Sequence, residues 1–79
     1  MMSNETVTTP YAERAKNILK GELKRRGLTY ADLADRLTAI GASESERNIA
    51  NKISRGSFTA AFFMMCMEVI GVNTVSLET

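Results

Sequence analysis

The chain has 79 residues, one cysteine, no histidine and a formal net charge of +1. One Cys without His excludes an internal disulfide, a zinc site and the Cys-His or Ser-His-Asp arrangements of nucleophilic enzymes, and it fits a reducing cytoplasm. The length predicts one domain with a small core, which a second copy of the chain would help to bury. No phosphate-cradling Gly-rich loop is present either. Together with the missing histidine, this leads us to expect no enzyme, no metal and no cofactor. Asp32 and Asp35 are close enough for acid-base work, but such a pair usually faces solvent.

Hydropathy predicts a cytoplasmic protein without a membrane partner. The longest uninterrupted apolar run, residues 60–67, has eight residues. A bilayer-spanning helix needs about 20. The first ten residues also lack the basic and apolar sections of a secretory signal.

Residues 1–8 are polar without a hydrophobic period, which predicts a disordered tail ahead of a helical domain of residues 9–73. Thr9 and Pro10 are typical of a helix start, and Gly27 of a helix end, so the first helix is expected from Pro10 to about Arg26. Its predicted inner side comprises Tyr11, Ala15, Ile18, Leu19 and Leu23.

Most of the positive charge lies in this first helix. Between Arg14 and Arg26 there are six basic residues and one acid, Glu22, for a net charge of +5. Concentrated Lys and Arg side chains provide the affinity of proteins for phosphates, so this basic block favours a nucleic-acid partner.

A second helix is expected from Tyr30 to about Ile40, with Thr29 and Asp32 as a capping pair and Gly41 at its end. Its predicted buried residues are Leu33, Ala34, Leu37 and Ile40. The next predicted cap is Ser43, so only two residues separate the second and third helices. A turn this short predicts a steep crossing, as in a helix-turn-helix.

The third helix is expected to occupy residues 44–55, with Ser43 and Glu46 as a capping box and Gly56 at its end. At roughly 100° per residue, one side collects Glu46, Ile49, Ala50 and Ile53. The opposite side collects Glu44, Arg47, Asn48, Asn51 and Arg55. Asn and Arg side chains can make paired hydrogen bonds to adenine and guanine edges in a major groove. An ordinary solvated face is the alternative interpretation.

Ser57 is predicted to cap a fourth helix from Phe58 to Ile70, which Gly71 ends. This helix is apolar nearly all round, so it either lies wholly in the core or shares a face with a second chain. The residues predicted for that core or dimer face are Phe62, Phe63, Met64 and Met67. Cys66 is expected to be a small buried hydrophobe. Residues 74–79 form a tail or a short strand, because 74–77 alternate polar and apolar.

Two resemblances follow from these residues. The pairs Leu28-Thr29 and Leu33-Ala34, with the segments Ile40-Gly41-Ala42-Ser43 and Ile53-Ser54-Arg55-Gly56, resemble the helix-turn-helix core of the Cro and phage-repressor family, over roughly residues 19–72. This implies an all-α, λ-repressor-like fold whose second and third helices form the DNA-reading unit. The phrase from Glu46 to Phe58 is similar to an uncharacterised bacterial family of small domains of unknown function.

The spacing departs from the repressor pattern at two places. In that family a glycine usually comes directly after the leucine that Leu37 matches. Here three residues, Thr38 to Ile40, separate Leu37 from Gly41. The interval from Ser43 to Gly56 is also longer, by about three residues, which is close to one helical turn. We therefore expect the second and third helices to be one turn longer, with Glu44 near the leading end of the third.

The leading hypothesis is sequence-specific binding of double-stranded DNA by a homodimer, as in a small bacterial transcription regulator. The predicted base-reading residues are Arg47, Asn48, Asn51 and Arg55. The predicted phosphate contacts are Lys20, Lys24, Arg25, Arg26 and Lys52. The alternative is a protein interaction or dimerisation module that uses the same frame without binding DNA.

Overall fold

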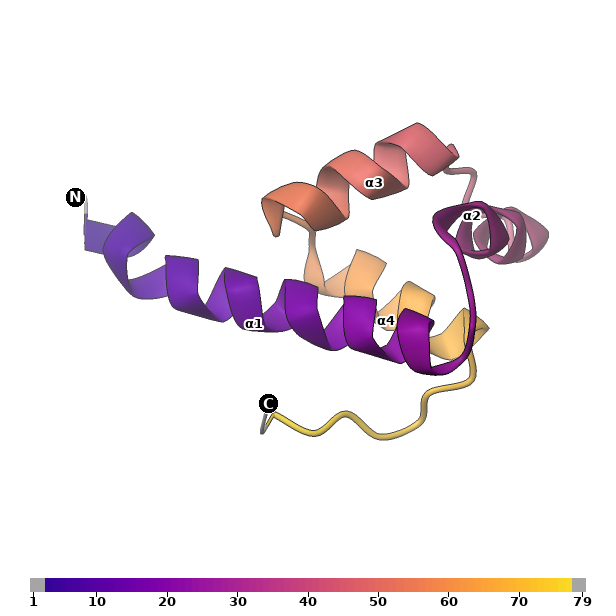
Figure 1. The fold of residues 1–79 in the computed structure, drawn as a ribbon. Helices are drawn as coiled ribbons and strands as arrows, with labels where there is room; N and C mark the ends of the chain where they lie inside the picture. Colours follow the sequence, from indigo (N-terminus) through magenta and orange to yellow (C-terminus); the bar gives the residue numbers. More distant parts are fainter. Residues whose placement is uncertain (1–2, 78–79) are drawn as a thin grey trace.

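Four α-helices joined by loops make up the described part of the chain, residues 3–77, in a computed structural model. They are α1 (Ser3–Arg25), α2 (Tyr30–Ala39), α3 (Glu46–Arg55) and α4 (Ala60–Val69). No strand occurs within residues 3–77, so the predicted all-α class is confirmed and 74–77 form no strand. Figure 1 shows α2 nearly end-on while α1 and α3 lie across the view, so α2 crosses α3 steeply. Both α3 and α4 pack against α1 and α2.

The first helix begins earlier than predicted. It starts at Ser3 and contains Pro10, so residues 3–8 are helical rather than a disordered tail, and Met1 and Met2 lie outside the described residues. A proline inside a helix removes one backbone hydrogen bond, but its fixed φ is helical. The Thr9-Pro10 pair could begin a helix, but it does not prevent α1 from beginning earlier, at Ser3.

The predicted boundary between α1 and α2 is confirmed. Gly27 has a left-handed φ of +67°, and the N–H of Leu28 donates to the carbonyl of Leu23 at 2.9 Å. The Thr29 hydroxyl accepts from the N–H of Asp32 at 3.1 Å, and the Asp32 carboxylate accepts from the N–H of Thr29 at 2.9 Å. These bonds lower the pKa of the Asp32 carboxyl. This reciprocal pair fixes where α2 begins.

The predicted caps of α3 and α4 are each two residues too early. Ser45 caps α3 by accepting from the N–H of Asn48 at 3.0 Å, and Thr59 caps α4 by accepting from the N–H of Phe62 at 3.0 Å. Ser43 and Ser57 are equally good caps by residue type, so local chemistry does not separate the two registers. Residues 40–45 bridge α2 and α3, and the additional residues before α3 therefore lie in this loop. The predicted two-residue turn and the longer third helix are wrong.

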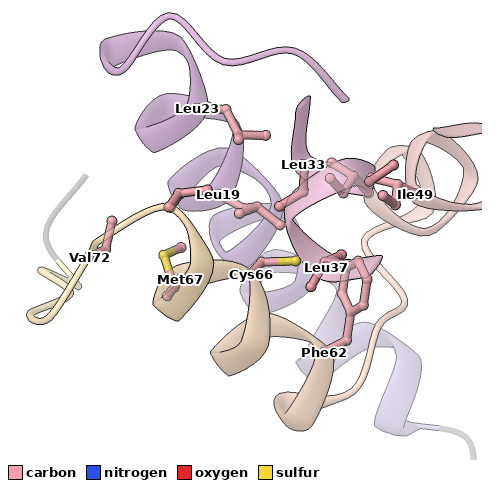
Figure 2. Close-up of a cluster of buried hydrophobic side chains, with 12 residues drawn as sticks. Leu19, Leu23, Leu33, Leu37, Ile49, Phe62, Cys66, Met67 and Val72 are labelled. Carbon is pink, nitrogen blue, oxygen red and sulfur yellow. The ribbon is translucent and has the colours of Figure 1, made fainter. Parts of the chain in front are cut away.

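The core lies where the four helices meet (Figure 2). Its buried residues are Leu19, Leu23, Leu33, Ala34, Leu37, Ile49, Ile53, Phe62, Cys66, Met67, Ile70 and Val72. Two predicted inner residues are instead exposed, Tyr11 by 62% and Ile40 by 52%. Ile40 is the C-cap of α2 and no longer follows the helical period. The N-terminal part of α1 extends past the other helices (Figure 1).

The predicted apolar face of α4 is divided between two environments. Phe62 and Met67 are buried, Phe63 is half-buried, and Met64 is 69% exposed. Residues two apart in a helix differ by about 200° in direction, so Phe62 and Met64 cannot face the same neighbour. Phe62 and Met67 therefore lie in the core, and Met64 is the one of the four that is mostly exposed.

The end of α3 lies close to α1 at Gly56. This glycine has a left-handed φ of +67°, and a Cβ there would lie 3.1 Å from the carbonyl oxygen of Ala12. Gly27 has the same φ of +67° with open space around it. A left-handed non-glycine residue costs about 1–2 kcal/mol. We expect Gly27→Ala to lower the free energy of unfolding by about that amount and Gly56→Ala to lower it further, as measured by urea denaturation. Equal losses would contradict the close approach.

Cys66 is fully buried, and this burial raises the pKa of its thiol to about 12, with the Glu44 carboxylate adding to the increase and the Lys52 ammonium opposing it. The thiolate is the nucleophile, so we expect iodoacetamide at pH 8 to leave Cys66 unlabelled in the native chain and to label it in guanidinium. The neutral thiol makes its full contribution to the stability of the fold below its ordinary pKa of 9.0, and this contribution is lost as the pH rises toward 12. Equal labelling of native and unfolded chains, followed by mass spectrometry, would contradict this prediction.

Candidate nucleic-acid interface

The outer face of α3, defined by Arg47, Asn48, Asn51 and Arg55, is exposed along its whole length. On the opposite side of the same helix, Ile49 and Ile53 are fully buried. Within residues 3–77, none of the four outer side chains forms a hydrogen bond or an ion pair. The structure thus brings all four predicted base-reading residues onto one unpaired surface.

The helical wheel missed one exposed residue of α3, Ser54, and placed another, Glu46, on the wrong side. Ser54 is exposed, three residues after Asn51 and seven after Arg47, so it belongs to the outer face. Glu46 is exposed although it was expected on the anchoring side, because it begins α3 and precedes the turns that carry Ile49 and Ile53. The helical period alone identifies Ser54, whereas the exposure of Glu46 depends on where the helix begins.

The Glu44 carboxylate, which was expected near the leading end of the third helix, lies in the loop before α3 and is paired inside the domain. It lies 2.6 Å from the Lys52 ammonium, and their side chains are 17% and 39% exposed. The ammonium also lies 4.7 Å from the centre of the Phe62 ring. The Glu44–Lys52 pair therefore ties the loop before α3 to α3 and α4. Lys52, one of the residues predicted to contact phosphate, is therefore paired with an acid inside the domain.

Replacing Lys52 tests this tether. An exposed ion pair contributes about 0.2–1 kcal/mol and a cation–π contact about 0.5–1 kcal/mol. We expect Lys52→Met to lower the free energy of unfolding by about 1 kcal/mol, whereas Lys20→Met, at an exposed and unpaired lysine, changes it by less than about 0.5 kcal/mol. In a double-mutant cycle with Glu44→Gln, a coupling energy of zero would contradict the pairing.

The basic block of α1 is divided between two positions. Arg25 and Arg26 lie 2.8 and 3.5 Å from the Glu22 carboxylate, and these cations lower the pKa of that carboxyl despite its partial desolvation. Lys20 and Lys24 are exposed and border a hollow at the start of α2. Of the predicted phosphate contacts, only these two lysines are cations without a partner in the described chain.

A protein-family model matches residues 11–75, from within α1 to the extended segment after α4. The family is described as a domain of unknown function, DUF6471. The chain belongs to this family. No curated protein and no solved structure matches it. The predicted similarity to a family of unknown function is confirmed. None of these comparisons matches the chain to the Cro and phage-repressor family.

One contact that holds this DUF6471 domain together has no local sequence signal. The Arg36 guanidinium of α2 donates to the carbonyl of Val69, the last residue of α4, at 2.9 Å. A cation at a helix C-terminus satisfies a free carbonyl and complements the helix dipole. Because the two residues are 33 positions apart, only the tertiary structure reveals this contact.

In the described chain, no three His, Cys, Asp or Glu side chains are grouped so as to hold a metal ion. No helix of residues 3–77 is both long and apolar enough to cross a membrane.

Proposed function

We propose that this DUF6471 domain binds double-stranded DNA, with α3 as the recognition helix and Arg47, Asn48, Asn51 and Arg55 reading base edges. The observation that supports this most is the outer face of α3, whose four Arg and Asn side chains are exposed and have no partner in the described part of the chain. Surface arginines commonly pair with neighbouring acids, yet Glu44, in the loop before α3, pairs with Lys52 instead. Among the described residues, Glu46, the first residue of α3, forms no ion pair with Arg47 or Arg55. The outer face therefore keeps its donors and its positive charge.

The dimensions of this face suit a major groove. From Arg47 to Arg55 the helix advances eight residues, or about 12 Å at 1.5 Å per residue. With base pairs about 3.4 Å apart, that length corresponds to three or four base pairs. The major groove is about 12 Å wide and admits one α-helix. In Figure 1, α3 lies at the edge of the group of helices, with α1 and α4 on one side of it.

Phosphate contacts in this proposal come first from Lys20 and Lys24, which have no partner within residues 3–77. Arg25 and Arg26 contribute further contacts, because their side chains are 67% and 40% exposed although both lie beside the Glu22 carboxylate. Two to four phosphate contacts per chain predict a slope of about −2 to −4 in log K against log salt. The affinity of one chain is therefore modest, which favours a homodimer on a two-fold site, as in a small cytoplasmic transcription regulator of bacteria.

Selection of bound duplexes from a random pool tests the proposal. We expect enrichment of a short motif, and a palindromic repeat of it if the chain binds as a dimer. Affinity for the enriched duplex is then measured against salt concentration. A pool without enrichment, or an affinity that does not change with salt, would contradict DNA binding.

The protein interaction module remains a second candidate because of one observation. Met64 is 69% exposed on a helix whose Phe62, Cys66 and Met67 pack into the core, and the adjacent Phe63 is only half-buried. Methionine-rich surfaces are common at protein-binding sites. If Met64→Ser abolishes self-association seen by light scattering while no duplex is enriched, the interaction module replaces the DNA-binding proposal.

A further inference from the structure

An apolar hollow of about 330 Å³ lies between α1, the start of α4 and the C-terminal segment. Tyr11 and Ile18 of α1 form one side, Phe58 and Phe63 a second, and Val75 and Leu77 of the C-terminal segment a third. Cavities that bind small molecules have volumes of about 300–1,000 Å³ and are lined mostly by hydrophobic side chains with a few polar groups. This hollow is at the lower end of that range, which suits a molecule of one or two fused rings.

The aromatic side of the hollow consists of flat, ordered surfaces. The rings of Phe58 and Phe63 are parallel to within 2°, with centres 6.1 Å apart. Phe62, whose side chain is buried, contacts the Phe58 ring at 5.7 Å with a tilt of 52° and so supports it from the core. A planar aromatic molecule gains both area burial and favourable ring geometry against such a surface.

Among the described residues that line the hollow, Arg14 is the only one with a formal charge. Its guanidinium donates to the carbonyl of Leu77 and lies 5.7 Å from the centre of the Tyr11 ring. It has no carboxylate partner among the described residues, unlike Lys16 on the same helix, which pairs with Glu13 at 3.2 Å. A guanidinium has five N–H donors in a planar fork, so donors remain for a bidentate contact with a carboxylate.

We propose that this hollow binds a small planar aromatic carboxylate. Its rings lie against Phe58 and Phe63, and its carboxylate pairs with Arg14 at the rim. The C-terminal segment forms a wall of the hollow and does not fill it, because Leu77 remains 68% exposed. This proposal does not rest on DNA binding.

Titration of the isotope-labelled full chain with 2-naphthoate, followed by amide chemical shifts, tests the proposal. We expect saturable one-to-one binding with the largest shifts at residues around the hollow. The neutral analogue 2-naphthylmethanol has the same rings without the charge, and we expect it to bind about tenfold more weakly. We expect Arg14→Gln to weaken 2-naphthoate about tenfold and to leave 2-naphthylmethanol unchanged. Lys16→Gln removes a nearby charge outside the hollow and should affect neither probe.

Ala60→Trp, which fills the hollow from the start of α4, should abolish binding of both probes. Equal affinity for the acid and the alcohol on the unmodified chain would overturn the proposal without any variant. An unchanged 2-naphthoate affinity in a folded Arg14→Gln chain would do the same. If sedimentation shows a dimer that Ala60→Trp dissociates, a second copy of the chain covers the hollow and the proposal is likewise overturned.

Discussion

Ile49→Ala is expected to lower the free energy of unfolding by about 2–5 kcal/mol. Ile49 lies on the inner side of α3, is fully buried, and belongs to the core cluster formed with α1, α2 and α4 (Figure 2). Shortening it leaves a cavity that the neighbouring side chains fill only in part. A domain of this size has a total stability of about 4–12 kcal/mol, so the loss is a large fraction of the whole.

Ile40→Ala is the matched control, because it makes the same chemical change at a side chain that is 52% exposed. We expect it to cost less than about 1 kcal/mol. Urea denaturation followed by circular dichroism measures both variants. Similar losses for the two would mean that α3 is not anchored through Ile49 in solution.

Asn51→Ala is expected to weaken binding to the selected duplex by about 1–3 kcal/mol, which is about 5- to 150-fold. Asn51 lies near the middle of the outer face of α3, with Arg47 and Arg55 four residues to either side. An asparagine amide can both donate to and accept from one adenine edge, and alanine can do neither. Binding is measured by fluorescence anisotropy at fixed salt.

Asn17→Ala supplies the control for this loss. Asn17 is an exposed residue of α1, about 160° around the helix from the buried Leu19, so the same substitution is made on a surface remote from α3. We expect the duplex affinity of Asn17→Ala to equal that of the unmodified chain. Equal weakening by both substitutions would show that Asn51 has no special contact, and no weakening by Asn51→Ala would remove it from the base-reading set.

Local chemistry determined much of this fold before any packing was known. The Thr29–Asp32 capping pair and the left-handed Gly27 and Gly41 mark the ends of α1 and α2 because their hydrogen bonds reach only a few residues along the chain. The helical period likewise predicted the buried positions Leu33, Leu37, Ile49 and Ile53 and the exposed outer face of α3. The DNA-binding role of that face remains a proposal, because exposure alone does not specify a partner.

Where two residues could serve equally well, only the tertiary structure decided. Ser43 and Ser45 are both good caps, and the need to bridge α2 and α3 with residues 40–45 selects Ser45. The same loop brings Glu44 to Lys52, so the charge of that lysine is paired with an acid of the same domain. The contact of Arg36 with Val69 and the hollow beside Arg14 each join residues far apart in the chain. Such pairings follow from how helix faces pack together, and the period of a single helix does not contain that information.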